Sequence, residues 1–244
     1  MAYIYGRNPV MEALQTGSIV QKIYVQHGNH SGKISQIYRT AKQQKIVVVN
    51  ADVKKLRQMV GKVNHQGVVA LISPVRIREM GEFSFTKRRS ASPLAFVIAD
   101  RIQDPHNMGA IIRGAEIFGA AGVIFSARDN TPITEVVVKA SAGAALHCPL
   151  YRANNLAQTA DWLRQNNVWI YGAALDADVA LWDIDFNRDC AIIIGSEEKG
   201  IRPLLLKKCD QTFRIPQIGK TQSLNASVAA GVVLAEMVRQ RSLK

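Results

Sequence analysis

The sequence has few cysteines and little negative charge. Its 244 residues include three cysteines, and 19 Asp and Glu stand against 31 Lys and Arg. Cys148, Cys190 and Cys209 are odd in number and lack the spacing of metal ligands, so we expect reduced, mostly buried thiols in a cytoplasmic protein. The shortage of acidic residues leaves a net charge of +12, which favours polyanionic partners such as RNA or DNA.

Long apolar segments are also missing. The N-terminus, MAYIYGRNPV, has no apolar signal core, and no run approaches the length that crosses a bilayer. We therefore expect neither secretion nor a membrane partner. The histidines show no metal-ligand grouping, so no metal site is predicted. Hydrophobic residues make up 48% of the chain, which supports a buried core, and we assign Trp162, Trp169 and Trp182 to it.

The chain divides into two halves joined by a linker. In residues 1–75, strand-like runs alternate with helical patterns, which predicts a small α/β domain. The predicted strands are 22–25, 45–50 and 67–72, and the predicted helices are 8–16, 33–43 and 52–60. Residues 76–92 have mixed charge and no sustained periodicity, so we predict a linker with at most one short element. Its basic cluster at 87–89 is typical of a solvated linker rather than of an RNA contact.

The second half, residues 93–244, has the pattern of a parallel α/β sheet. Strands are predicted at 94–100, 122–126, 168–173, 190–195 and 212–216, with helices at 108–118 and 224–240. The strands are almost continuously apolar, which indicates helices on both faces of the sheet. Ligands of such sheets bind at the carboxyl ends of the strands.

Three segments place unusual residues at that edge. In the first, a polar loop after a strand leads to a helix that carries Asn107 and, six residues later, Arg113. The second is the turn GSEEKG at 195–200, and the third is SLNASVAAG at 223–231, whose small residues predict close helix packing. Each segment alone has a plain structural interpretation as a cap or a Gly-rich turn. No G-x-G-x-x-G or Walker loop is present, which argues against ordinary nucleotide binding.

Together these segments resemble the SpoU branch of the SPOUT methyltransferases. They match its motifs N-x-G-x-x-x-R, G-S-E-x-x-G and I-P-x-x-G-x-x-x-S-L-N-x-S-V-A in order. YGRNPVMEAL at 5–14 and HQGVVAL at 65–71 resemble the substrate-binding domain of 23S rRNA (guanosine-2′-O)-methyltransferases of the RlmB type, so the resemblance covers nearly the whole chain. The chain departs from many relatives in having Glu198 where they have Gly.

The resemblance implies S-adenosyl-L-methionine (AdoMet) as cofactor and a ribose 2′-hydroxyl of 23S ribosomal RNA, in a guanosine, as methyl acceptor. It also implies a homodimer and a deep trefoil knot in the catalytic domain, which general folding rules do not predict. The implied cofactor contacts are Gly195, Ile215 and Leu224, with Glu197 and Pro216 as neighbours. The implied catalytic residues are Asn107, Arg113, Glu197, Ser223 and Asn225.

An arginine is a poor general base because its guanidinium stays protonated in proteins. We therefore expect Arg113 to bind the phosphate beside the target ribose and to orient the nucleophile. In this hypothesis Asn107 and Glu197 hold Arg113, and Ser223 and Asn225 fix the loop. Three alternatives remain open: the same chemistry on tRNA, an RNA-binding module without catalysis, and an ordinary nucleotide-binding enzyme.

Overall fold

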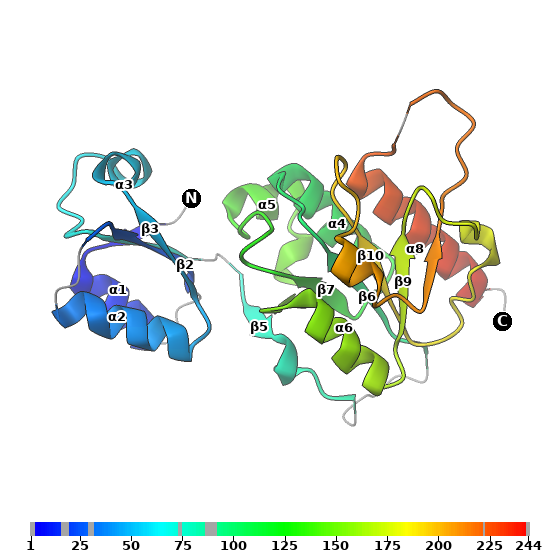
Figure 1. Ribbon diagram of the computed structural model, residues 1–244, viewed down its shortest axis with the longest axis horizontal. Coiled ribbons are helices and arrows are strands. Elements are labelled where there is room, and N and C mark those ends of the chain that lie inside the picture. Colours follow the sequence, from blue (N-terminus) through cyan, green and yellow to red (C-terminus); the bar gives the residue numbers. More distant parts are fainter. Residues whose placement is uncertain are drawn as a thin grey trace. The chain divides into compact units, whose positions relative to one another are not determined.

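The computed structural model describes residues 3–15, 20–28, 32–72, 75–85, 92–221 and 223–242 (Figure 1). The chain forms two compact units. The smaller unit contains Met1–Arg76 and Pro132–Val136, and the larger contains Ile77–Thr131 and Val137–Lys244. The basic cluster at 87–89 lies outside the described residues.

The smaller unit is a mixed four-stranded sheet with helices on both faces. Its order is β1-β4-β2-β3, with β2 parallel to β3 and antiparallel to β4. Alternate residues of β4 point to opposite faces, so Val68 and Ala70 pack beneath α1 and α2, whereas Val69 packs with Leu56 of α3. The elements are β1 (Tyr3–Tyr5), α1 (Arg7–Gln15), β2 (Val20–Gln26), α2 (Gly32–Gln43), β3 (Val47–Ala51), α3 (Val53–Val60) and β4 (Val68–Ile72).

The larger unit is a seven-stranded sheet in which every strand pair is parallel. Its order is β11-β9-β10-β6-β7-β8-β5, which confirms the parallel sheet expected from the apolar runs. Its strands are β5 (Ile77–Glu79), β6 (Ala95–Ala99), β7 (Gly122–Phe125), β8 (Leu150–Arg152), β9 (Trp169–Ala173), β10 (Cys190–Ile194) and β11 (Gln211–Phe213). Its helices are η1 (Met80–Glu82), α4 (Pro105–Ile117), α5 (Glu135–Ala140), η3 (Ala144–Leu146), α6 (Leu156–Gln165), η4 (Leu181–Asp183), α7 (Pro203–Leu206) and α8 (Ala226–Ser242).

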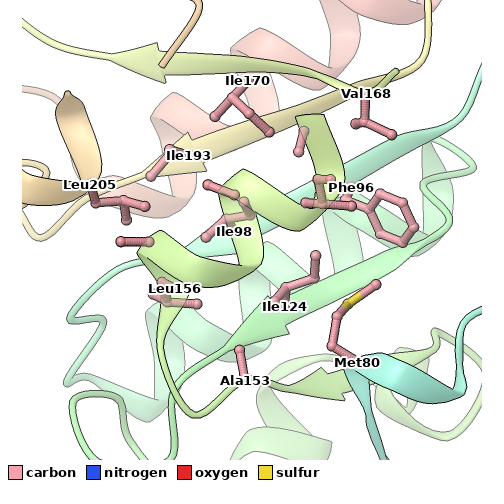
Figure 2. Close-up of a cluster of buried hydrophobic side chains, with 14 of the residues drawn as sticks. Met80, Phe96, Ile98, Ile124, Ala153, Leu156, Val168, Ile170, Ile193 and Leu205 are labelled. Carbon is pink, nitrogen blue, oxygen red and sulfur yellow. The ribbon is translucent and has the colours of Figure 1, made fainter. Parts of the chain in front are cut away.

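Both faces of this sheet are buried. On one face, Ile98 and Ile193 pack with Leu156 of α6 and Leu205 of α7, as Figure 2 shows. The alternate residues of the same strands point to the other face, where α4 contacts β6 and β7, and α8 contacts α4 and β10. Gly109 lets α4 approach α5 closely, because a Cβ there would lie 2.5 Å from the Cβ of Ala140.

The last helix is fixed at its far end by one arginine. Arg241 donates hydrogen bonds to the carbonyls of Pro93, Leu94 and Phe186, where β6 begins. The C-terminus of α8 therefore lies at the amino end of the sheet. Because a helix of 17 residues is about 25 Å long, the N-terminus of α8 lies near the opposite edge, where ligands of parallel sheets bind.

Three of the differences between the structure and the sequence predictions are as follows. Ile77–Glu79, inside the predicted linker, is an edge strand that pairs with β8, and Glu79 forms an ion pair with Arg152 at 2.5 Å. Three residues are too short a run for hydrophobic periodicity to reveal. Trp169 and Trp182 are 41% and 53% exposed, so their assignment to the core was wrong. A Cβ added at Gly231 would meet no atom of the described residues within 4 Å, contrary to the close packing expected there.

No helix in the described residues is long and apolar enough to cross a membrane. The same part of the chain contains no group of three or more His, Cys, Asp or Glu side chains arranged to hold a metal ion. The knot implied by the resemblance stays a prediction.

The three cysteines are free thiols, two of them buried. Burial raises the pKa of Cys148, Cys190 and Cys209 from 9.0 to about 12. A shift of this size leaves roughly 1000-fold less reactive thiolate at pH 8. We expect a thiol reagent such as 5,5′-dithiobis(2-nitrobenzoate) to react slowly with the folded protein and with all three thiols in guanidinium chloride. Rapid reaction of the folded protein would contradict the buried, neutral thiols.

Candidate functional site

Three segments meet at the carboxyl edge of the larger sheet. The loop after β6 leads into α4, whose N-cap Asp104 accepts a hydrogen bond from the backbone of His106 at 2.9 Å. Pro105 begins the helix, a position at which proline is favoured, so Asn107 falls in its first turn. The turn 195–200 follows β10, and α8 begins directly after Asn225.

The side chain of Asn225 has a fixed orientation. Its Oδ1 accepts hydrogen bonds from the backbone and hydroxyl of Ser227, at 2.9 and 2.6 Å, and so caps α8. The amide nitrogen must then point away from the helix. It donates to Oδ1 of Asn107 at 2.8 Å and to Oε1 of Glu197 at 2.6 Å, which uses both of its hydrogens.

Glu197 completes this network. Its Oε1 accepts from Nδ2 of Asn107 at 2.7 Å and from the backbone of Ala226 at 3.3 Å, in addition to Asn225. A carboxylate is stabilised at this place because the free amides of the first helical turn carry partial positive charge. Side chains 90 and 28 residues apart in sequence from Glu197 thus converge on one oxygen atom.

The turn that carries Glu197 closes tightly on itself. Ser196 and Gly200 exchange two backbone hydrogen bonds of 3.2 and 2.8 Å, and Gly200 has a φ of +57°. A Cβ on Gly195 would lie 2.2 Å from the carbonyl carbon of Gly200. Only glycine fits at position 195, because the contact is with backbone that cannot move aside.

This turn forms one wall of a cavity of about 390 Å³. The opposite walls come from the segments after β9 and β11 and from the start of α8. Five of the residues predicted from sequence line it: Gly195, Glu197, Ile215, Ser223 and Leu224. Pro216 is not among the lining residues, although its neighbours Ile215 and Gln217 are. The wall combines backbone polar groups of the turn with apolar side chains, a composition suited to a small organic ligand.

Arg113 stands apart from this network. It lies six residues beyond Asn107 in α4, about 9 Å further along the helix axis and on a different face. Its side chain is exposed and makes no hydrogen bond or ion pair within the described part of the chain. Within one chain Asn107 and Glu197 do not hold Arg113, because those two side chains are bonded to each other and to Asn225.

Sequence reasoning missed two parts of the site. Leu175 and Asp176 line the cavity from the loop after β9. The signal was present, because that loop follows the carboxyl end of a predicted parallel strand. Asp100 and Arg101 follow β6 at the same edge and contact the turn 195–200 and its flank.

Replacing Asn225 should destabilise the protein in two distinct ways. Asn225→Ala removes the helix cap and the hydrogen bonds to Asn107 and Glu197, so we expect the free energy of unfolding to fall by about 2 kcal/mol in urea. Asn225→Asp keeps the cap but places a second carboxylate against Glu197. Repulsion between the two carboxylates grows as both become ionised, so this variant should lose stability as the pH rises from 5 to 7. Equal stability of the Asp variant at both pH values would contradict the network.

Comparison with known proteins assigns the family. The model of the SpoU rRNA Methylase family matches residues 94–235, and that of RNA 2′-O ribose methyltransferase substrate binding matches residues 3–78. A Staphylococcus haemolyticus protein assigned to the TrmH family of tRNA/rRNA methyltransferases is 38% identical over 238 residues, covering 98% of this chain and 95% of that protein.

Two crystal structures of methyltransferases share the fold. The SpoU methyltransferase AviRb from Streptomyces viridochromogenes has 25% identity and a TM-score of 0.61, over 99% of this chain and 90% of that one. An AdoMet-bound rRNA methyltransferase from Sinorhizobium meliloti has 26% identity and a TM-score of 0.59, over 97% of this chain and 86% of that one. With both halves matched by family models, and with the three motifs converging on one network and one cavity, this chain belongs to the SpoU family of RNA methyltransferases.

Proposed function

We propose that this RNA methyltransferase methylates a ribose 2′-hydroxyl in 23S rRNA, at a guanosine, in the cytoplasm. The observation that carries the reaction is the convergence of Asn107, Glu197 and Asn225 beside a cavity closed by Gly195. The ribose 2′-hydroxyl is supported by the match of residues 3–78 to a 2′-O ribose methyltransferase substrate-binding model.

AdoMet is the cofactor, and its sulfonium supplies an activated methyl group. The cavity residues fit this group, because the turn 195–200, which can close tightly only with glycine at 195, lines the cavity beside the apolar side chains of Ile215 and Leu224. In the proposal Gly195, Ile215 and Leu224 bind the cofactor, with Glu197 and Pro216 beside them. Asn107, Glu197, Asn225 and Ser223 fix the two chain segments that frame it.

Arg113 is free to bind RNA. Its exposed guanidinium has no partner in the described residues, and a planar fork of donors suits a phosphate. We assign it to the phosphate beside the target ribose, where it orients the hydroxyl for in-line attack. This role requires that the target reach the cavity and Arg113 at once, and a homodimer in which each protomer lends Arg113 to its partner meets that requirement.

The smaller unit supplies most of the attraction for RNA. Residues 1–76 contain eleven Lys and Arg and two Asp and Glu, and so hold nine of the twelve excess positive charges. Binding that depends on phosphates weakens as salt displaces these contacts. A tRNA substrate is the second candidate, since the Staphylococcus haemolyticus relative is assigned to a tRNA/rRNA family. We prefer the larger RNA because the chain carries a separate substrate-binding domain, over residues 3–78, in addition to the methylase domain.

Transfer of labelled methyl from AdoMet to unmodified 23S rRNA, with tRNA in parallel, tests the proposal. We expect label on the rRNA, at one guanosine ribose, when 2′-O-methylated positions are mapped. Label on tRNA alone would discard the rRNA substrate and keep the chemistry. AdoMet binding without transfer to either RNA would require an assembly intermediate as substrate, and no AdoMet binding would leave an RNA-binding module.

Replacing Arg113 should abolish transfer and spare cofactor binding. We expect Arg113→Ala to lower kcat by about 100-fold or more, because the orienting contact is lost, with the AdoMet Kd within twofold of the unaltered protein. Arg113→Lys keeps the positive charge but loses the planar guanidinium, so its kcat should lie between those of the unaltered protein and Arg113→Ala. Turnover retained in Arg113→Ala would contradict the assignment.

Mixing two inactive variants tests whether Arg113 acts on the partner. Gly195→Val cannot form the cavity, whereas Arg113→Ala retains it. If Arg113 acts across the dimer, mixed dimers contain one complete site and activity returns on mixing. If it acts within its own subunit, each site in the mixed dimer lacks one component and the mixture stays inactive.

A further inference from the structure

The turn at the cavity is held from its outer side by two residues that the three motifs do not include. Asp100 and Arg101 directly follow β6. The guanidinium of Arg101 donates to the carbonyl of Gly200 at 2.9 Å and to that of Lys199 at 3.3 Å. Asp100, which is fully buried, accepts from the backbone of Arg202 at 2.8 Å and from its Nε at 2.7 Å. The end of the turn and the residue Arg202 just beyond it are thus both bonded to the residues that follow β6.

Arg101 carries two features that cost free energy. Its φ is +60°, a left-handed conformation that an arginine rarely adopts. Its Nε is buried and has no hydrogen-bond partner among the described residues, with Oδ2 of Asp100 4.0 Å away. Strain and an unpaired polar atom in one residue point to a function when the residue lies at a ligand site.

The carbonyls that Arg101 holds belong to the wall of the cavity. Lys199 and Gly200 both line it, and the carbonyl of Gly200 also accepts the backbone N–H of Ser196 that closes the turn. Without the guanidinium, the closure would depend on the exchange between Ser196 and Gly200 and on the bond from the backbone N–H of Lys199 to the Ser196 hydroxyl at 3.3 Å. The position of Glu197, inside the same turn, depends on that closure.

We propose that Arg101 is a positioning residue for the cofactor, which holds the turn 195–200 in the shape that binds AdoMet. Asp100 assists it by fixing the end of the turn through Arg202. The inference rests on the proposed function, because it takes AdoMet to be the molecule that occupies the cavity.

Arg101→Asn separates positioning from folding. Asparagine adopts positive φ more readily than arginine, so the variant relieves the strain and removes the guanidinium together. We expect the Tm of the ligand-free protein to be unchanged or higher. The AdoMet Kd, measured by calorimetry, should rise about 10-fold because charge-assisted hydrogen bonds to the turn are lost. The KM for AdoMet should rise with it, and the KM for RNA should not change.

Lys45→Asn is a matched control. Lys45 is exposed, has a φ of +56°, and belongs to the smaller unit, which does not contain the turn. Lys45→Asn should relieve the same kind of backbone strain and leave the AdoMet Kd unchanged. Arg101→Lys keeps one cationic donor and should recover part of the lost affinity.

Proteolysis gives a readout that needs no cofactor. A lysine-specific protease should cut the Lys199–Gly200 bond faster in Arg101→Asn than in the unaltered protein, as fragment masses would show. An AdoMet Kd within twofold of the unaltered protein, or a Tm that falls in parallel with the affinity, overturns the positioning role. If the unaltered protein does not bind AdoMet, the proposed function itself fails, and this inference fails with it.

Discussion

One carboxylate oxygen organises the carboxyl edge of the larger sheet. Oε1 of Glu197 receives N–H groups from Asn107, Asn225 and Ala226, and each comes from a helix start. The carboxylate belongs to a turn in which Gly195 packs directly against the backbone of Gly200. The carboxylate therefore cannot move with either helix if one of them shifts. Glu197 therefore fixes the starts of α4 and α8 relative to the turn after β10. That turn and the start of α8 both line the cavity, so the same contacts help to set its shape.

Much of this site was predictable because its residues are of informative types at informative places. Asn107, Glu197 and Asn225 lie at ends of apolar strands and starts of helices, where short polar side chains cap helices and meet ligands. The role of Arg113 was not predictable in the same way. The helical repeat predicts which face of α4 Arg113 occupies relative to Asn107. It does not predict which groups hydrogen-bond to Asn107 and Glu197, because these two residues are 90 positions apart in the sequence. Sequence spacing alone does not contain such a contact.

In the fold, too, some elements could be predicted from the sequence and others could not. Long apolar strands such as β6 and β10 are recognisable in the sequence, because both of their faces are buried. Strands β1, β5, β8 and β11 have three residues each, too few to show a period, and of these four β11 alone overlaps a predicted strand, 212–216. Exposed aromatic residues cause a different error, because their hydrophobicity assigns them to the core although they lie at the surface. Trp169 is stacked against the guanidinium of Arg188 at 4.3 Å, a surface contact that supports an aromatic side chain outside the core.

The edge strand β5 has a consequence for how such enzymes can be rearranged in evolution. Because Ile77–Glu79 belongs to the catalytic sheet, the usable joint between the two units is the short stretch before Ile77, rather than the whole polar segment that follows. A recombination that exchanged everything before residue 93 would remove β5 from its place beside β8 and leave a bare sheet edge open to aggregation. Shuffling at residues 75–76 would leave that edge covered, so new specificities are more accessible through breakpoints there.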